Sequence, residues 1–408
     1  MAPAASATSP DDRIHLLDAL RGFALFGIFF ANIQDWSTWG WMGREAQVAL
    51  AGETVTRVVN FTHLILVDGK FYTIFSFLFG MGFALQLSRL EGRGEDGRAI
   101  YRRRLALLLL IGLAHLSLLW AGDILTLYAL LGFTLPLFRH LPDRRLLTLA
   151  AALILLPIPG YAVFAALGVP PDLGMQGVAI GLGDHLFTAW TGETPPPELE
   201  WFARGDWAAY WSWTLSGPPW RLGALLESWR FPKVLGIMLL GLWAGRHLVA
   251  GTLLADRRRL ARVAGWGLLV GLPANAAYAA MGGLWQEDAW RGLATTTLYA
   301  LGVVPLGLAY AALFALAWRR ASRWLGVLAA PGRMALTNYL GQTLIGMAIF
   351  QGIGLGLAGQ VGPGVVFATA AAVLALQVAA SNAWLRRYRQ GPMEWAWRKG
   401  TYAGRARA

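Results

Sequence analysis

Long apolar segments dominate this sequence and restrict the folds that it can adopt. Continuous runs of about 20 mostly apolar residues, enough for one helix to span a bilayer, recur along the sequence. They begin near residues 14, 60, 103, 124, 146, 232, 263, 292, 335 and 363. Hydrophobic residues make up 56% of the chain and charged residues 14%, which is too apolar for an ordinary water-soluble core. The runs do not alternate as strands in lipid must. We therefore predict an all-α, polytopic integral membrane protein of ten transmembrane helices.

The basic residues predict the orientation of these helices. The net charge is +12, and Arg and Lys gather in every second loop. The positive-inside rule places those loops and both termini in the cytoplasm, and places the loops at 36–58, 168–230, 282–291 and 358–362 outside. Topology and contact with anionic membrane lipids explain these residues, so no nucleic-acid partner is expected. The opening MAPAASATSPDD has no basic region, which argues against a cleaved signal peptide.

The predicted organisation has one helical domain between two tails. Residues 1–13 form a disordered cytoplasmic tail, 14–385 the transmembrane domain, and 386–408 a basic cytoplasmic tail. The outer loop at 168–230 is rich in tryptophan: Trp190, Trp201, Trp207, Trp211, Trp213, Trp220 and Trp229. Two readings stay open for this loop. The indoles form an aromatic belt at the interface, or they form a platform on which a substrate stacks.

Ionisable side chains inside the apolar segments are the candidates for function, because such groups are expensive in lipid. Asp68 and Lys70 in the second segment are two residues apart and point to different faces, so each needs another partner. His115 lies in the third segment. Asp123 follows eight residues later, about 12 Å along a helix axis, and we expect it to be too far away to orient His115. Asp123 also suits an N-cap of the fourth helix.

The sequence also has two candidate amide side chains, and it lacks several motifs of known enzymes. Asn338 and Gln342 are four residues apart on one helix face, so they can bond each other, a ligand or a neighbouring helix. The sequence has no Cys, which excludes disulfides and thiolate nucleophiles. Zinc, phosphate-loop, nucleophile-elbow and dinucleotide motifs are absent, and no metal is expected.

Five stretches carry a resemblance to a known family. They are LDALRGFALFGI (17–28), KFYTIFSFLFGMG (70–82), LIGLAHLSLLWAGDILTLYALLG (110–132), GRMALTNYLGQTLI (332–345) and RQGPMEWAWR (389–398). In this order they resemble the YeiB-like family of bacterial inner-membrane proteins. That family is similar to the transmembrane acyltransferases, which include heparan-α-glucosaminide N-acetyltransferase and the acyltransferase-3 proteins. The resemblance implies a multi-pass protein of the bacterial inner membrane that takes an acyl group from cytoplasmic acyl-CoA, including acetyl-CoA.

The resemblance also implies site residues. Acyltransferase-3 proteins follow an Arg of the first helix, after ten residues, with an essential His. The matching Arg21 is followed by Asn32, so another residue must replace that His. We expect His115 to be the general base, with His63 as the second choice.

The remaining roles follow from the same resemblance. Arg21 and Arg333 are expected to bind the CoA phosphates. Asp18, one turn from Arg21, is expected to pair with it, and that pair alone would also suit a structural role at the end of a helix. Asn338, Gln342 or Lys70 would steady the oxyanion.

The sequence leaves other functions open. A proton-coupled transporter would use Asp68, Lys70 and His115 near the midplane, and an accessory subunit would use the same groups only for packing. The acceptor of an acyl group would be a glycan or another small molecule with a hydroxyl or amine. Glycine-rich helix faces permit a homodimer without requiring one.

Overall fold

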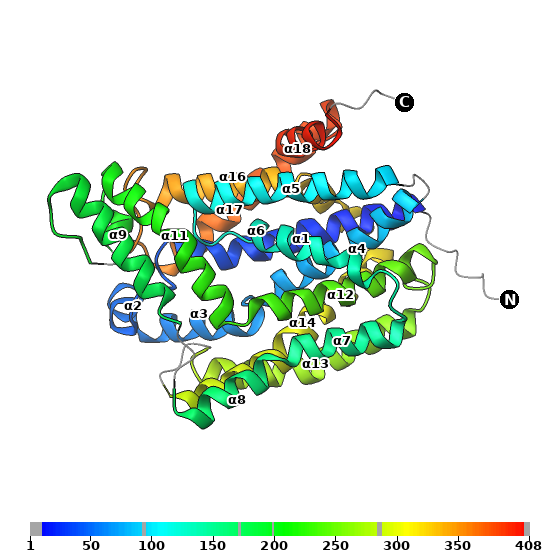
Figure 1. The fold of residues 1–408 in the computed structure, drawn as a ribbon, viewed down its shortest axis with the longest axis horizontal. Coiled ribbons are helices and arrows are strands. Elements are labelled where there is room, and N and C mark those ends of the chain that lie inside the picture. The colour runs from blue at the N-terminus through cyan, green and yellow to red at the C-terminus, as the bar shows by residue number, and fades with distance from the viewer. Residues whose placement is uncertain (1–9, 92–94, 170–172, 198–199, 284–287, 404–408) are drawn as a thin grey trace.

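The fold is a bundle of helices (Figure 1). The computed structural model describes residues 10–91, 95–169, 173–197, 200–283 and 288–403, and every regular element in these ranges is a helix. The predicted all-α class is therefore confirmed. The start of α1 lies at one end of the bundle, whereas α2 and α9 lie at the opposite end (Figure 1).

The helices follow one another with short connections. Their bounds are α1 (Pro10–Trp36), α2 (Arg44–Ala51), α3 (Glu53–Leu66), α4 (Lys70–Glu91), α5 (Glu95–Leu118), α6 (Leu125–Thr134), η1 (Leu135–Phe138), α7 (Asp143–Leu155), α8 (Pro157–Leu167), α9 (Met175–Thr191), α10 (Glu200–Ala203), α11 (Trp207–Glu227), α12 (Arg230–Val249), α13 (Arg257–Ala280), α14 (Ala289–Leu325), η2 (Gly326–Leu328), α15 (Ala329–Arg333), α16 (Ala335–Phe350), α17 (Pro363–Arg387) and α18 (Pro392–Tyr402).

Helices stand at all ten positions where the sequence predicts a membrane span. Within the described ranges, six stretches are long and apolar enough to cross a bilayer: His15–Trp36, Glu53–Leu87, Asp143–Leu167, Arg257–Ala280, Ala289–Arg333 and Pro363–Arg387. The other predicted spans coincide with α5, α6 with η1, α12 and α16. These are shorter or carry more charge. The number of crossings and the side that the termini face stay predictions.

The second predicted span is interrupted. Helix α3 ends at Leu66 and α4 begins at Lys70. Gly69 between them has a φ of +81°, a left-handed conformation that glycine adopts without a steric penalty. The break places Asp68 and Lys70 at the ends of two separate helices.

Helices α4 and α12 pack closely against each other. A Cβ at Gly80 would lie 1.9 Å from the Met238 carbonyl oxygen, and one at Gly241 would lie 2.0 Å from that of Phe77. Only glycine allows the two backbones to approach this closely. Their contact lies in the largest apolar core, which also contains buried residues of α5, α6 and α7.

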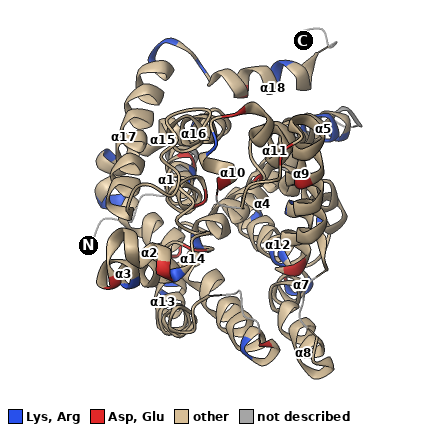
Figure 2. Cartoon of the chain, turned by 90° about the vertical axis from the view of Figure 1, so that its left-hand side faces the viewer, with Lys and Arg blue, Asp and Glu red and all other residues tan. Residues whose placement is uncertain are grey.

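Two peripheral parts shape the ends of the bundle. The Trp-rich segment, which the sequence predicts to lie outside the membrane, is largely helical in its described residues, as α9, α10 and α11. Near the C-terminal end of the sequence, α18 crosses the edge of the bundle between α17 and α5 (Figure 2). Its Trp397 donates a hydrogen bond of 2.8 Å to the Arg104 carbonyl oxygen on α5.

Candidate functional site

A buried histidine and aspartate form the centre of the candidate site. His115 Nδ1 lies 2.9 Å from Asp123 Oδ1, and the two side chains are 1% and 0% exposed. An ionised carboxylate only accepts hydrogen bonds, so we assign the proton to Nδ1 and the free lone pair to Nε2. This arrangement fixes the ring orientation of His115.

The contact corrects the expectation that Asp123 is too far away to orient His115. That expectation assumed one continuous helix, but α5 ends at Leu118 and the chain then turns back before α6. The backbone N–H groups of Leu119 and Trp120 both donate to the His115 carbonyl oxygen, at 3.0 and 2.9 Å. Distance along a helix axis therefore does not measure the separation of these two side chains.

Asp123 also caps the following helix, as the sequence suggests. Its Oδ1 accepts from the Leu125 N–H at 3.1 Å, and its Oδ2 accepts from the Thr126 N–H at 2.7 Å. One carboxylate thus both caps the start of α6 and orients His115. Backbone donors and the imidazole hold the carboxylate from different sides, which leaves it little freedom to rotate.

A threonine completes the cluster from a distant part of the chain. Thr343 Oγ1 on α16 lies 3.0 Å from His115 Nε2, and Thr343 is fully buried. A hydroxyl, an imidazole and a carboxylate in this order have the spacing of a nucleophile, a base and the group that orients the base. The sequence analysis did not single out Thr343, although it drew attention to the neighbouring Gln342.

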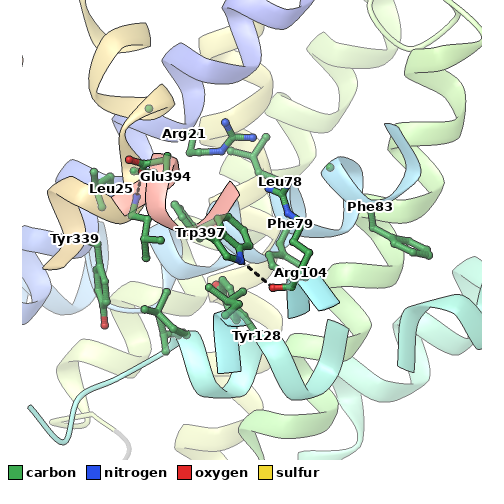
Figure 3. A pocket seen from close by; sticks show the side chains of 18 of the residues that line it. Arg21, Leu25, Leu78, Phe79, Phe83, Arg104, Tyr128, Tyr339, Glu394 and Trp397 are labelled. Atoms are coloured by element: carbon green, nitrogen blue, oxygen red, sulfur yellow. Dashed lines mark hydrogen bonds between the residues drawn. The ribbon is translucent and has the colours of Figure 1, made fainter. Parts of the chain in front are cut away.

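A cavity of about 270 Å³, which we name the inner cavity after the predicted topology, extends toward this cluster. Three arginines from three helices line it: Arg21 on α1, Arg104 on α5 and Arg333 on α15. Its walls are mostly aromatic and aliphatic, with Phe75, Phe79, Phe83, Tyr101 and Tyr128 among them. Figure 3 shows Arg21, Arg104 and Trp397 around the cavity, with Tyr128 and Tyr339 on other parts of its wall.

The Tyr339 side chain borders both the inner cavity and His115. Tyr339 lines the cavity, and its ring centroid lies 5.2 Å from that of His115. The buried Tyr339 hydroxyl has no hydrogen-bond partner among the described residues. Arg104 and His115 are eleven residues apart on α5, so the arginines lie roughly 16 Å along the axis from the histidine.

A second, smaller cavity approaches the cluster from the other direction. It has a volume of about 50 Å³ and is lined by Asp35, Trp41, Trp213, Trp220 and other residues. Trp120, which also lines it, meets the His115 ring edge-on at 6.3 Å. Arg221 Nε donates to the Asp123 carbonyl oxygen at 2.9 Å. The His115–Asp123 pair therefore lies between the inner and the outer cavity.

The predicted pair on the first helix is confirmed. Arg21 Nη1 lies 2.8 Å from Asp18 Oδ1, and Arg21 still lines the inner cavity. Arg333 lines the same cavity and donates to the Arg389 carbonyl oxygen at 2.9 Å. Asn32 is half-buried further along α1 and does not line this cavity.

The two predicted amides bond a neighbouring helix. Asn338 Nδ2 donates to Ser381 Oγ at 3.0 Å, and Gln342 Nε2 donates to Gln377 Oε1 at 2.9 Å. Both acceptors are on α17, so these amides join helices and do not bond each other. That was one of the alternatives given by the sequence.

The remaining predicted residues lie apart from the histidine. The Asp68 Oδ2 accepts from the Tyr278 hydroxyl at 3.1 Å, and Lys70 Nζ donates to the Leu64 carbonyl oxygen at 2.5 Å. His63 Nδ1 lies 2.5 Å from Gln34 Nε2. Neither cavity is lined by any of these three residues. Within the described ranges, no group of three His, Cys, Asp or Glu side chains could hold a metal ion.

Sequence reasoning missed several residues of the site. Arg104 belongs to a basic loop cluster and Arg221 to the Trp-rich segment, so neither stood out as a charge inside an apolar segment. Tyr339 lies in an apolar segment and Trp397 in the basic tail, and neither has a distinguishing spacing. Their shared location appears only when α5, α11, α16 and α18 come together.

The chain is similar to one described protein family and to several uncharacterized bacterial proteins. A family described as "Protein of unknown function (DUF418)" matches residues 244–404. The uncharacterized protein YxaH of Bacillus subtilis (strain 168) is 31% identical over 405 residues, covering 97% of this chain and 96% of that protein. The uncharacterized protein YeiB of Escherichia coli (strain K12) is 32% identical over 398 residues, covering 94% of each. A 39.9 kDa protein of Bacillus acidopullulyticus is 35% identical over 172 residues, 42% of this chain and 46% of that protein.

Proposed function

The chain belongs to the YeiB-like family, and on that premise we propose that it is a membrane-embedded acyltransferase. In this proposal, cytoplasmic acyl-CoA donates an acyl group to a hydroxyl or amine acceptor at the outer face. The observation that carries the proposal is the buried His115–Asp123 pair between two cavities. A base in that position would be reached by a donor from one side and an acceptor from the other.

The inner cavity suits the narrow end of acyl-CoA. Its volume of about 270 Å³ is at the small end of ligand pockets, so it would take the pantetheine arm with a short acyl group such as acetyl. The bulky nucleotide would stay at the cytoplasmic rim. There, Arg21, Arg104 and Arg333 would bind its phosphates through charge-assisted hydrogen bonds.

The proposed chemistry uses His115 Nε2 as a general base. Nε2 removes the proton from the acceptor hydroxyl or amine while the acceptor atom attacks the thioester carbonyl. Collapse of the tetrahedral intermediate breaks the C–S bond, and the CoA thiolate takes the proton from the imidazolium. Asp123 holds the ring and stabilises its protonated form. The buried Tyr339 hydroxyl is better placed than Asn338 or Gln342 to stabilise the oxyanion, because both amides already bond α17.

Thr343 indicates where an acceptor would bind. Its hydroxyl lies 3.0 Å from Nε2, the separation expected between a base and the proton donor that it activates. An acceptor entering past Trp120 and Arg221 would approach the same nitrogen. Those residues belong to the outer cavity, which agrees with the predicted delivery of the acyl group beyond the membrane.

A second candidate function is a proton-coupled carrier of a small or lipid-linked substrate. The observation in its favour is the break between α3 and α4, which exposes two helix ends inside a predicted span. Interrupted helices often bind substrates or ions in transporters. Counterflow of a labelled substrate by purified protein in liposomes, without CoA, would favour this function.

The first test of the acyltransferase measures donor binding. Purified protein in detergent is titrated with acetyl-CoA, longer acyl-CoAs and free CoA while its thermal unfolding midpoint is followed. A ligand that prefers the folded state raises that midpoint. We expect Arg21→Ala to weaken acetyl-CoA binding by about 10- to 100-fold, because it removes a charge-assisted contact. Arg258→Ala is the control, since Arg258 is exposed on α13 and does not line the cavity.

The second test measures the chemistry. Release of the CoA thiol is followed with acetyl-CoA as donor and with glucose, N-acetylglucosamine or ethanolamine as acceptor. We expect His115→Ala to bind acetyl-CoA normally and to lose acceptor-dependent thiol release. Full transfer by that variant would remove His115 from the mechanism, and failure of every CoA species to bind would reject the acyltransferase proposal.

A further inference from the structure

Two helix N-termini meet in the interior, away from the histidine site. Helix α4 begins at Lys70, after the break at Gly69, and α12 begins at Arg230. The two helices run in the same direction, because Arg230 at the start of α12 lies against Tyr72 near the start of α4, and Gly245 near the end of α12 lies against Ala84. Their dipoles therefore point the same way, and the positive ends of both lie close together.

The first turn of α12 adds two cations at this positive end. The Arg230 guanidinium lies 4.9 Å from the centroid of the Tyr72 ring, and Lys233 Nζ lies 4.6 Å from that of the Tyr299 ring. Lys233 is only 3% exposed. Two like charges three residues apart repel each other, and a helix N-terminus favours negative charge. The arrangement is electrostatically unfavourable without an anion.

In the described part of the chain, no carboxylate lies within salt-bridge distance of these two cations. Among the described residues, Arg230 and Lys233 form no salt bridge and donate no hydrogen bond. Asp68 interacts electrostatically with both, but its carboxylate accepts from the Tyr278 hydroxyl. Burying an unpaired charge is costly, so such a pair calls for a partner from outside the chain.

Unpartnered polar atoms surround the same place. Arg230 Nε is buried without a hydrogen-bond partner in the described part of the chain. The buried hydroxyls of Tyr72 and Tyr299 interact with each other, but neither has a partner in hydrogen-bonding geometry among the described residues. Tyr299 is 2% exposed and Tyr72 is 9% exposed. These donors come from three helices, α12, α4 and α14, and they surround the first turn of α12. Buried donors rarely remain unsatisfied in native proteins.

We propose that Arg230, Lys233, Tyr72 and Tyr299 form a binding site for a compact oxyanion, the chemistry shared by a carboxylate and a phosphate group. The guanidinium offers paired N–H donors to two oxygens. Lys233 contributes charge, and the two hydroxyls complete the donor set. The site is separate from the inner cavity, which none of these four residues lines. It does not depend on acyl transfer, and it would serve a carrier of anionic substrates equally well.

The test follows thermal unfolding of the full-length protein in detergent. Sodium phosphate and sodium acetate are titrated separately, with sodium chloride keeping the ionic strength constant. We expect a saturable rise of the midpoint with at least one of the two, and the one that acts identifies the group as phosphate or carboxylate. In Lys233→Met the apparent Kd should rise at least 10-fold, as expected for loss of a charge-assisted contact.

Two control variants test whether the rise of the unfolding midpoint comes from anion binding at the proposed site. The chain has three lysines, and Lys399→Met changes one that is exposed on α18, so its titration should match the parent. Arg21→Ala should also keep the response, which separates this site from the arginines of the inner cavity. Tyr299→Phe repeats the test if Lys233→Met fails to fold. A midpoint that follows ionic strength alone, or an unchanged Kd in both site variants, would overturn the proposal.

Discussion

Two buried polar clusters in this molecule are built in opposite ways. In the first, both ring nitrogens of His115 and both carboxylate oxygens of Asp123 have partners within the described chain. In the second, Arg230 and Lys233 face aromatic rings and have no hydrogen-bonding partner there. The first cluster is internally complete, and the second depends on something that binds to it.

This difference indicates different functions. A fully hydrogen-bonded set holds its members in one geometry, which a proton-transfer step needs. Unpaired buried cations destabilise the folded protein until an anion binds to them, so binding of an anion stabilises this cluster most. The protein would thus use one cluster for chemistry and the other for binding. The following predictions test this division of roles.

The largest effect is expected from Asp123→Asn. The amide keeps the shape of the carboxylate but does not stabilise a protonated His115, so acyl transfer should fall by about 10²- to 10⁴-fold. Acetyl-CoA binding and the oxyanion response should stay as in the parent. Thiol release gives the rate, and the two thermal titrations give the binding.

The double variant Asp123→Asn with His115→Ala makes this prediction sharper. Residues that act as one unit have non-additive effects, so the double variant should be no slower than His115→Ala alone. If the fold loss of rate in the double variant equals the product of the two single losses, the two residues act independently.

A smaller effect is expected from Gly80→Ala, which acts on the second cluster through packing. Its Cβ would meet the Met238 carbonyl oxygen, so α4 and α12 must move apart, at a cost of about 1–3 kcal/mol in unfolding free energy. The oxyanion response should weaken because Tyr72 and Arg230 lie on these two helices. Gly82→Ala is the matched control, since a Cβ there has open space. Equal stability of the two variants would contradict the packing argument.

The sequence predicted where the helices lie because apolar run length is a local property. It did not predict the break at Gly69, because Asp68, Gly69 and Lys70 lie inside one apolar run whose average hydropathy hides them. It also could not predict the short distance from His115 to Asp123. That distance depends on where α5 ends, and no proline or cap residue marks Leu118 in the sequence.

The composition of the candidate site was predictable only in part. Charged residues within spans are conspicuous, so His115, Asp123 and Arg21 could be named from the sequence. Tyr339, Thr343 and Trp397 could not, because tyrosine, threonine and tryptophan occur throughout such helices and their role depends on long-range packing. Lys233 and Arg230 were not named for a related reason. They lie at the border between the predicted outer loop and the span that begins near residue 232, so they were not counted among the charges inside a span.

Trp397→Ala should weaken acetyl-CoA binding by about 10-fold, an effect on the inner cavity alone. Trp397 lines that cavity, and the Arg104 guanidinium lies 4.1 Å from the centroid of its ring. Loss of the indole removes apolar wall and leaves the arginine without its stacking partner. Trp395→Ala is the control on the same helix, because Trp395 is 53% exposed and does not line the cavity. Thermal titration with acetyl-CoA measures both, and a similar loss in both would mean that α18 acts only through its general stability.

The smallest effects come from two tyrosines that differ only in whether their hydroxyl is paired. The Tyr101 hydroxyl donates to the Gly132 carbonyl oxygen at 2.8 Å, so Tyr101→Phe should cost about 1 kcal/mol of unfolding free energy. The Tyr299 hydroxyl is buried without a partner in hydrogen-bonding geometry among the described residues. Without an oxyanion, Tyr299→Phe should therefore cost close to nothing, and with saturating oxyanion it should become the less stable protein. Chemical denaturation in matched phosphate, acetate and chloride solutions measures both differences. An equal cost for both tyrosines in chloride alone would mean that the Tyr299 hydroxyl is satisfied within the protein, and the contrast between the two clusters would then rest on Arg230 and Lys233 alone.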